Sequence, residues 1–525
     1  MTLKSPNVLL LVLDTHRLDR LSLYGYEQQT TPAIDEFAQG ATVFDWGIST
    51  AQWTIPSHAS MFTGLYPTIH QTNQTYTALS DEIPTLAEML RDNGYHTVGF
   101  CNNPLVGVLD NGLKRGFDRF YNYSGYVPTV PGPRDKRRPL ARFKRKPGVE
   151  KVLSQFTNLV ERQFGHSSLL LWFSMQEWFV PFWTLTGRFK GDTKQSLHDV
   201  ADYLRYHSAT HQDEPFFMFI NMMETHLPYY PPRRMEEQWV PYLKRDREAR
   251  DFLKRFNVQS YRWVAPMIEP FTPLQERVLS DMYDAEIAYQ DMQLRRVFRH
   301  LERSGELEDT MVIIVSDHGE SHGDHNFMGH AFVIYNELVH VPLIIHYPAM
   351  FPAGKRIEKT VSTRRLFHTI LEAAGIPYEG YGHTAHELSL ARTVEDKDPD
   401  GEVVVAEAYP PLNFIEVMQL NNPEAIDLFR VRMLRRAIYD GGRKLMTVDD
   451  RPDEMFDIHD DPREMRNLLD NPLGYENDLL RLEKMLEEYV VLAEAHRDGT
   501  AAGKEIDLSN NPELLDRLRG LGYIE

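Results

Sequence analysis

The stretch Asn7-Val-Leu-Leu-Leu-Val-Leu-Asp14 decides the class of fold that this sequence of 525 residues predicts. Its apolar residues follow one another without polar alternation, as in a strand that is covered on both faces. The run is too short to span a membrane and lacks the small residues of a leader-peptide cleavage site. We therefore expect a buried strand that ends at Asp14.

Similar apolar runs recur along the chain and alternate with helical patterns. The predicted strands are residues 8–13, 97–101, 216–220, 311–315, 341–345 and 403–406, and the predicted helices include residues 85–92, 274–303 and 363–374. Alternation of strands and helices is typical of a doubly wound α/β fold, with a mostly parallel sheet flanked by helices. Shorter strands and polar turns near the end predict a smaller C-terminal α+β domain.

We predict three regions: a catalytic domain over residues 1–385, the C-terminal α+β domain over 386–490 and a helical tail over 491–525. Residues 123–190 interrupt the α/β pattern with a basic arm and an apolar, aromatic segment, which we interpret as an insertion. Two hypotheses for this insertion stay open. It is either a structural cap or subunit interface, or residues 134–185 contact an anionic membrane surface.

Composition narrows the classes of function. The formal net charge of −19 argues against broad binding to nucleic acids, because neutralising phosphates requires Lys and Arg. Cys101 is the single cysteine, so an internal disulfide is not possible. With no predicted membrane span, these features predict a soluble, cytoplasmic protein, and they are compatible with a homo-oligomer.

Polar side chains follow directly on the predicted strands. Asp14 ends the first strand, Asn103 follows the second, His226 lies shortly after the third, and Asp317 follows the fourth. Ligands of open α/β sheets bind beyond the carboxyl ends of the strands, so we expect these side chains to converge. His226 can bind a metal or protonate a leaving group, although a structural loop histidine is an equal alternative on this evidence alone.

The stretch Trp53-Thr-Ile-Pro-Ser-His-Ala-Ser-Met-Phe-Thr-Gly64 predicts a short helix that opens near Pro56 and ends at Gly64. The hydroxyl of Thr54 would face free backbone N–H groups and the positive end of the helix dipole. That environment suits attack on an anionic ester. Taken alone, this stretch favours the simpler interpretation of Thr54 as an N-cap residue.

The stretch Val315-Ser-Asp-His-Gly-Glu-Ser-His-Gly-Asp-His325, followed by His330, is rich in side chains that bind metals. Asp317 and His318 end a predicted strand, and a carboxylate with an imidazole is ordinary ligation for Zn²⁺ or Mn²⁺. Asp14 would supply a further hard oxygen at the same edge, which keeps Ca²⁺ and Mg²⁺ as alternatives.

Taken together and in this order, these stretches resemble the sulfatase family of the alkaline-phosphatase superfamily. The resemblance runs from about residue 6 to residue 375 and includes Thr31-Pro-Ala-Ile-Asp35 and Val341-Pro-Leu-Ile-Ile345. A weaker similarity covers Met455-Phe-Asp-Ile-His-Asp-Asp-Pro-Arg-Glu-Met-Arg-Asn-Leu468. The resemblance implies an alkaline-phosphatase-like fold, an anionic ester substrate and one or two divalent metal ions held by Asp14, Thr54, Asp317 and His318.

The sequence departs from typical sulfatases at the nucleophile. Those enzymes carry a Cys or Ser that is oxidised to formylglycine, in a motif with Arg, whereas Thr54 occupies this position here and His58 replaces the Arg. A Thr nucleophile is common in the phosphodiesterase and phosphoethanolamine-transferase branches of the superfamily. Thr15 stands where many sulfatases have a second Asp ligand, which leaves the number of metal ions open.

The resemblance to those branches implies a hydrolase or transferase of phosphate or phosphonate esters that forms a covalent phospho-threonine. The implied catalytic residues are Thr54, His226 and His330, and the implied substrate contacts are His58, Asn103 and His325. Two alternatives stay open. One is a sulfate-ester hydrolase with an unmodified Thr54, and the other is a catalytically inactive binding protein that retains the fold.

Overall fold

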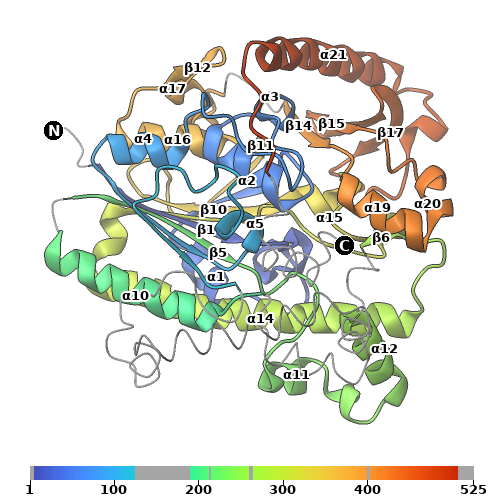
Figure 1. The fold of residues 1–525 in the computed structure, drawn as a ribbon, viewed down its shortest axis with the longest axis horizontal. Coiled ribbons are helices and arrows are strands. Elements are labelled where there is room, and N and C mark those ends of the chain that lie inside the picture. Colours follow the sequence, from blue (N-terminus) through green and yellow to red (C-terminus); the bar gives the residue numbers. More distant parts are fainter. Residues whose placement is uncertain (1–4, 125–189, 212–213, 259–263, 399–402, 507–525) are drawn as a thin grey trace.

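The computed structural model describes residues 5–124, 190–211, 214–258, 264–398 and 403–506 (Figure 1). At the centre of these residues lies an eight-stranded sheet with the order β11-β2-β10-β7-β1-β5-β3-β4. Its strands are β1 (Asn7–Leu13), β2 (Thr42–Ile48), β3 (His96–Cys101), β4 (Arg119–Asn122), β5 (Phe216–Met222), β7 (Thr310–Val315), β10 (His340–His346) and β11 (Lys355–Ser362). The predicted α/β fold with a mostly parallel sheet is confirmed.

The parallel part of the sheet is built around β1. This strand pairs in parallel with β5 on one side and with β7 on the other, so that Val12 lies beside Asn221 and beside Val315. Strand β3 continues the parallel arrangement next to β5. The carboxyl ends of β1, β3, β5 and β7 therefore meet at one edge of the sheet, where ligands of such folds bind.

Helices cover both faces of the sheet, with α10 and α14 below it and α4 and α16 above it in Figure 1. Alternate residues of β1 belong to opposite layers. Leu9 and Leu11 belong to the core between the sheet and α1 (Pro32–Ala38), α10 (Thr193–Thr210) and α14 (Pro273–Ser304). Leu10 and Val12 belong to the core between the sheet and α2 (Thr54–Thr63), α4 (Leu86–Asp92) and α16 (Arg365–Ala374). Coverage on both faces explains why the run is apolar without alternation.

Two of the predicted parallel strands are placed differently by the structure. Residues 341–345 lie in β10, which pairs antiparallel with β7 and β2, so the prediction of a parallel strand is wrong. The connection from β7 to β10 contains the short strands β8 (Ser321–His322) and β9 (Phe327–Gly329) and the short helix α15 (Asn336–Val339), and no long helix that crosses over the sheet as between parallel partners. Residues 403–406 fall in a second sheet.

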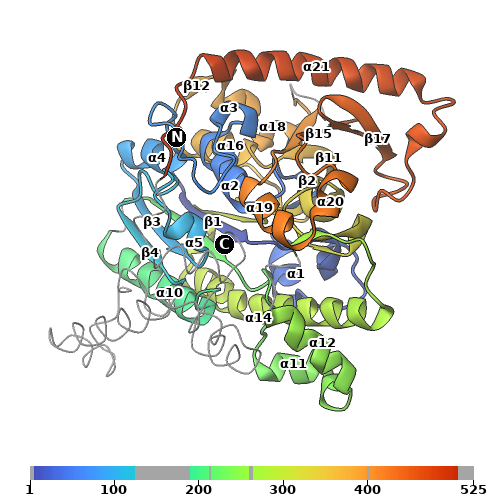
Figure 2. The same ribbon diagram turned by 45° about the vertical axis from the view of Figure 1, so that its right-hand side comes forward.

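The second sheet is antiparallel and contains β14 (Val404–Ala408), β15 (Arg435–Asp440), β16 (Arg443–Val448) and β17 (Arg451–Asp457). The long helix α21 (Glu476–Asp498) covers one face, as Figure 2 shows at the top of the molecule. The other face joins the core that contains Ile55 of α2 and Leu338 of α15. Helix α21 runs unbroken through the boundary predicted at residue 490, and the exact domain limits stay predictions.

Some of the predicted features concern residues outside the described part of the chain. The predicted insertion over residues 123–190 is described only at its two ends, so membrane contact through residues 134–185 falls outside it. The last part of the predicted tail, residues 507–525, lies outside it as well. Among the described helices, none combines the length and apolar character needed to cross a bilayer.

Candidate active site

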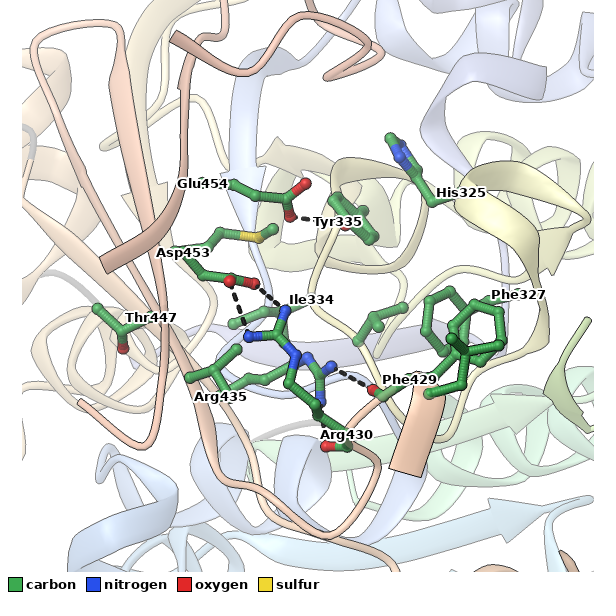
Figure 3. A pocket seen from close by; sticks show the side chains of 14 residues that line it. His325, Phe327, Ile334, Tyr335, Phe429, Arg430, Arg435, Thr447, Asp453 and Glu454 are labelled. Atoms are coloured by element: carbon green, nitrogen blue, oxygen red, sulfur yellow. Dashed lines mark hydrogen bonds and ion pairs between the residues drawn. The ribbon is translucent and has the colours of Figure 1, made fainter. Parts of the chain in front are cut away.

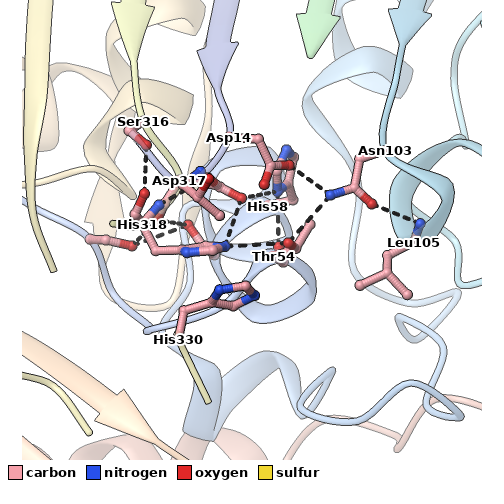
Figure 4. A network of polar contacts seen from close by, with 12 residues as sticks. Asp14, Thr54, His58, Asn103, Leu105, Ser316, Asp317, His318 and His330 are labelled. Atoms are coloured by element: carbon pink, nitrogen blue, oxygen red, sulfur yellow. Dashed lines mark hydrogen bonds and ion pairs between the residues drawn. The ribbon is translucent and has the colours of Figure 1, made fainter. Parts of the chain in front are cut away.

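Two carboxylates and an imidazole meet at the carboxyl edge of the large sheet (Figure 4). Asp14 directly follows β1, and Asp317 and His318 lie just beyond β7, the neighbouring parallel strand. One ligand atom from each of the three residues lies within 4.8 Å of the other two. All three side chains are fully buried. Because β1 and β7 pair in parallel, residues distant in sequence meet in one cluster.

Each carboxylate is held through one of its two oxygens. Asp317 Oδ1 accepts from the backbone N–H of Thr15 at 3.2 Å and of His318 at 2.9 Å. Asp14 Oδ2 accepts from Asn103 Nδ2 at 2.6 Å and from Asn221 Nδ2 at 3.0 Å. The other oxygens, Asp14 Oδ1 and Asp317 Oδ2, are buried without a hydrogen-bond partner among the described residues, although Asp317 Oδ2 lies 3.3 Å from His318 Nε2 and 3.5 Å from His58 Nδ1. Such oxygens are costly to bury, and a divalent cation between them would satisfy both.

The pKa values of Asp14 and His318 also indicate a site for a cation. Burial and the nearby charge of Asp317 raise the pKa of Asp14 to about 7. Burial opposes charge on His318 too, but the carboxylates of Asp317 and Asp14 overcome it and raise the pKa of His318 to about 9. The cluster therefore requires a positive charge, which an imidazolium supplies in part and a metal ion would supply in full.

Thr54 is the first residue of α2, and its hydroxyl points into this cluster (Figure 4). Thr54 Oγ1 lies 3.3 Å from His318 Nε2, and it accepts from Asn103 Nδ2 at 3.4 Å. The N-cap position belongs to Trp53, so the interpretation of Thr54 as an N-cap residue is wrong. Its position at the start of the helix gives the hydroxyl the dipole environment that favours bound anions.

His58 lies directly behind Thr54. Its Nδ1–H donates to the backbone carbonyl of Thr54 at 2.9 Å, and its Nε2 faces Asn221 Nδ2 at 3.4 Å. Burial lowers the pKa of His58, so the ring is neutral and these contacts fix its tautomer. The structure therefore places His58 against the backbone of Thr54, although the sequence assigned it to a substrate contact.

His226 and His330 stand beside the cluster. The ring of His330 lies 4.5 Å from that of His318 and 4.9 Å from that of His226, measured between centroids. His330 Nδ1 donates to Glu320 Oε1 at 2.8 Å, while its Nε2 is buried without a hydrogen-bond partner among the described residues. Burial lowers the pKa of His226 to about 3 and holds that of His330 well below its usual value, so both rings are neutral.

His325 is separated from this network. Its ring stacks on Tyr335 with 3.7 Å between centroids, and its Nε2 donates to the carbonyl of Arg463 at 3.1 Å. Figure 3 shows His325 and Tyr335 at a pocket that the C-terminal sheet also lines. The backbone turns at His325 with φ 50°, which directs its side chain away from the segment that carries His318. The predicted substrate contact of His325 therefore has no geometric support.

The structure adds residues that the sequence did not single out. Asn221 contacts both Asp14 and His58, and Glu320 holds His330. A signal for Asn221 was present, because it is the one polar residue in the otherwise apolar strand Phe216–Met222. Thr15 has φ 57°, an unusual value for a β-branched residue, and this conformation directs its N–H to Asp317.

Comparison with known proteins agrees with this geometry. The family model described as Sulfatase matches residues 6–376, so the chain belongs to the sulfatase family. The uncharacterized sulfatase YidJ of Escherichia coli is 23% identical over 384 residues, covering 71% of this chain and 69% of that protein.

Two solved structures share the fold. BT4656, in complex with its substrate D-glucosamine-2-N,6-O-disulfate, has a TM-score of 0.65 and 17% identity, covering 94% of this chain and 99% of that chain. The phosphonate monoester hydrolase of Agrobacterium radiobacter has a TM-score of 0.62 and 19% identity, covering 94% of this chain and 96% of that chain. The family fold thus occurs in proteins named for sulfur esters and for phosphorus esters.

Replacing Asp317 should test the predicted metal group. We expect Asp317→Ala to lose bound divalent metal and ester hydrolysis together, since it removes one of the two negatively charged ligands of the predicted metal ion. Metal affinity should fall by at least ~10-fold to 100-fold, the range found even for groups that only support ligands. Elemental analysis of dialysed protein measures this, with circular dichroism to show that the fold is retained.

Asp324→Asn is the matched control for this variant. Asp324 lies in the same segment but pairs with Arg17, so its metal content should equal that of the wild type. Wild-type metal content in Asp317→Ala would mean that the ion is bound elsewhere.

Proposed function

We propose that this member of the sulfatase family is a metal-dependent hydrolase of monoanionic esters, with Thr54 as its nucleophile. The observation that carries the proposal is the position of Thr54 Oγ1, 3.3 Å from His318 Nε2 at the amino end of α2. The hydroxyl thereby combines a helix dipole, a carboxylate cluster and a nearby imidazole. This combination is the usual environment of an activated oxygen nucleophile.

The residues present fit a divalent cation. Asp14 and Asp317 each offer a buried oxygen without a hydrogen-bond partner among the described residues, and His318 Nε2 and Thr54 Oγ1 lie beside them. When bound, the ion would lower the pKa of the Thr54 hydroxyl and neutralise charge on the ester oxygens. Mixed carboxylate and imidazole donors suit Zn²⁺ or Mn²⁺ in particular. Elemental analysis, which gives the number of metal ions per chain, tests whether His226 and His330 hold a second ion.

The covalent steps balance in two halves. In the first, Thr54 Oγ1 forms a bond to sulfur or phosphorus, and the bond to the departing alcohol oxygen breaks. A neutral imidazole accepts the hydroxyl proton and returns it to the alcohol. In the second half, water attacks the same centre, the bond to Thr54 Oγ1 breaks, and the imidazole moves the water proton to Thr54.

We assign this relay to His330. Its Nδ1–H is engaged by Glu320, and its Nε2 lone pair is left for the interior of the site. Both half-reactions begin with acceptance of a proton, which requires the neutral ring that burial favours. His226 beside it would stabilise the departing oxygen. Asn103 Nδ2, which reaches both Asp14 and Thr54, would donate to a non-bridging oxygen of the ester.

The charge of the site favours an ester group with one negative charge. The described residues hydrogen-bonded to Asp14, Asp317 and Thr54 include no Lys or Arg, and the neighbouring histidines His58, His226 and His330 are neutral. A divalent ion would therefore be largely neutralised by the two carboxylates. Sulfate monoesters, phosphonate monoesters and phosphate diesters each carry one charge, whereas a phosphate monoester carries nearly two.

Sulfate esters are the first substrate class. The family and the named relatives support this class better than the phosphorus esters that the sequence favoured, since the Escherichia coli relative is named a sulfatase and BT4656 is described with a sulfated sugar as substrate. Thr54 would then act without conversion to formylglycine. Its sulfo-threonine intermediate would need direct attack by water, whose proton the neutral His330 would accept.

Phosphonate monoesters and phosphate diesters are the second class. A Thr oxygen is the ordinary nucleophile of the phosphoryl-transfer branches that the sequence resembles, and a phospho-threonine is released by water attack without oxidation of the side chain. Phosphonate monoester hydrolases of Agrobacterium radiobacter and Silicibacter pomeroyi share the fold, at TM-scores of 0.62 and 0.64.

Thr54 should remain unmodified in the purified protein. Formylglycine arises from Cys or Ser, and residue 54 is Thr followed by His58 rather than Arg. Peptide mass spectrometry should find residue 54 at the mass of threonine. A mass change at residue 54 in the resting protein would contradict the proposed nucleophile.

Thr54→Ala should retain the metal and lose turnover. Asp14, Asp317 and His318 stay in place, but no oxygen can form the covalent intermediate, so kcat should fall by at least ~10³-fold by analogy with other catalytic nucleophiles. Thr54→Ser is the matched variant, because it restores the hydroxyl and should recover part of the rate. If Thr54→Ala kept near-normal turnover, water would be the direct nucleophile.

A panel of nitrophenyl esters tests the charge argument and separates the two substrate classes. We expect metal-dependent hydrolysis of monoanionic esters, namely an aryl sulfate, an aryl phosphonate monoester or a diaryl phosphate. The dianionic aryl phosphate should be slower by ~10-fold or more in kcat/KM, because one extra uncompensated charge costs at least ~1 kcal/mol at such distances. The ester with the highest kcat/KM identifies the class.

The opposite order would contradict the charge argument, since a preference for the dianionic ester requires a Lys or Arg beside Asp14, Asp317 and Thr54, and the described hydrogen bonds of these three residues include none. Stoichiometric metal without hydrolysis of any ester in the panel would instead favour the inactive binding protein.

A further inference from the structure

A second group of metal-binding side chains lies at the opposite edge of the large sheet. It consists of His96, His207, His211 and Glu214. His96 begins β3, the strand whose other end leads to Asn103 of the active site. The strand from His96 to Cys101 spans about 17 Å at ~3.3 Å per residue, so the two groups are independent.

The geometry of this group is that of a chelate. One ligand atom each of His96, His211 and Glu214 lies within 4.8 Å of the other two. The rings of His96 and His211 are 4.8 Å apart at an angle of 70°, and His96 Nε2 pairs with a carboxylate oxygen of Glu214. Three donors from two segments, the start of β3 and the turn between α10 and β5, therefore already converge on one point.

His207 adds a third imidazole beside this group. It precedes His211 by one helical turn, which places both rings on the same face at the end of α10. Its ring centroid lies 5.6 Å from that of His211 and 5.8 Å from that of His96. His207 is only 6% exposed, and its Nε2 is buried without a hydrogen-bond partner among the described residues.

Such a nitrogen needs an explanation, because buried polar atoms are normally satisfied. A surface ion pair between His96 and Glu214 alone accounts for neither the buried nitrogen of His207 nor the approach of His211, since such pairs contribute little.

We propose that His96, His211 and Glu214 bind a transition-metal ion, with Zn²⁺ as the best match, and that His207 stands beside them as a further imidazole. Imidazole and carboxylate donors are ordinary ligands of Zn²⁺, and Cu²⁺ and Ni²⁺ bind similar sets. The ion would connect the end of α10 to the starts of β3 and β5. These segments are already adjacent, since the N–H of His96 donates to the carbonyl of Pro215 at 2.9 Å.

The role of this ion is structural. Helix α10 covers the lower face of the large sheet and enters the core through Leu197, Val200 and Leu204. A metal bound at its last turn would hold the helix against the strands that it covers. Binding only to the folded state then raises stability by mass action.

The experiment uses untagged, full-length protein that has been treated with a chelator and desalted. Asp317→Asn removes a charge from the active-site cluster, so zinc titration of this variant isolates the second site. We expect one equivalent of Zn²⁺ to bind, with a rise in Tm. Adding His211→Ala or Glu214→Gln should weaken binding by ~10-fold or more and abolish the rise in Tm.

His198→Ala is the matched control, because His198 is a half-exposed histidine on the same helix whose partner is Asp202. It should bind zinc like its parent. In the wild-type background, His211→Ala should hold one zinc fewer than the wild type and hydrolyse esters at the wild-type rate. The proposal is overturned if Asp317→Asn takes up no zinc, or if both His211→Ala and Glu214→Gln bind zinc as their parent does. Neither outcome depends on ester hydrolysis, so it leaves the proposed function untouched.

Discussion

Repulsion between two buried carboxylates is the constraint on which the active site depends. Asp14 and Asp317 are placed side by side because β1 and β7 are neighbouring parallel strands with Val12 in register with Val315. In the folded core neither charge reaches water, and each leaves one oxygen without a hydrogen-bond partner among the described residues. The arrangement is unfavourable by itself and becomes favourable only with a cation or a proton, which is a physical signature of a metal site.

The surrounding chain maintains this unfavourable arrangement. Thr15 adopts φ 57° so that its N–H reaches Asp317, at a cost of about 1–3 kcal/mol for a non-glycine residue. Gly319 passes so close to the segment after β9 that a Cβ there would lie 1.9 Å from the carbonyl oxygen of Glu337. Only glycine fits at that point, and the segment carrying His318 is thereby fixed against α15. Strain of this kind persists where the rest of the core determines the geometry.

Local pattern in the sequence was enough to predict the metal group, whereas features that depend on packing were missed. Asp14, Asp317 and His318 were predictable because they come after apolar runs that could only be buried strands. Strands β2 and β11 were missed, since Asp45 interrupts the apolar pattern of β2, and Lys355 and Arg356 that of the edge strand β11. The direction of β10 was also beyond local pattern, because it depends on how the chain returns from β7. His325 was grouped with His318 by nearness in sequence, and a turn in the backbone separates them.

The C-terminal sheet supports segments that adjoin the candidate active site. The buried ammonium of Lys444 donates to the carbonyl of Ile334 at 2.7 Å and pairs with Glu464, whose other oxygen accepts from the N–H of Asn336 at 2.6 Å. The segment held in this way comes directly after His330, and it accepts a hydrogen bond from Gly319 through Leu338 at 2.7 Å. The same face of the sheet belongs to the core that also contains Ile55, the residue after Thr54. Thr54, His318 and His330 come from three separate segments, and each adjoins residues that pack on or bond to this face. A change in the packing of the sheet would therefore move Thr54, His318 and His330 together rather than one at a time.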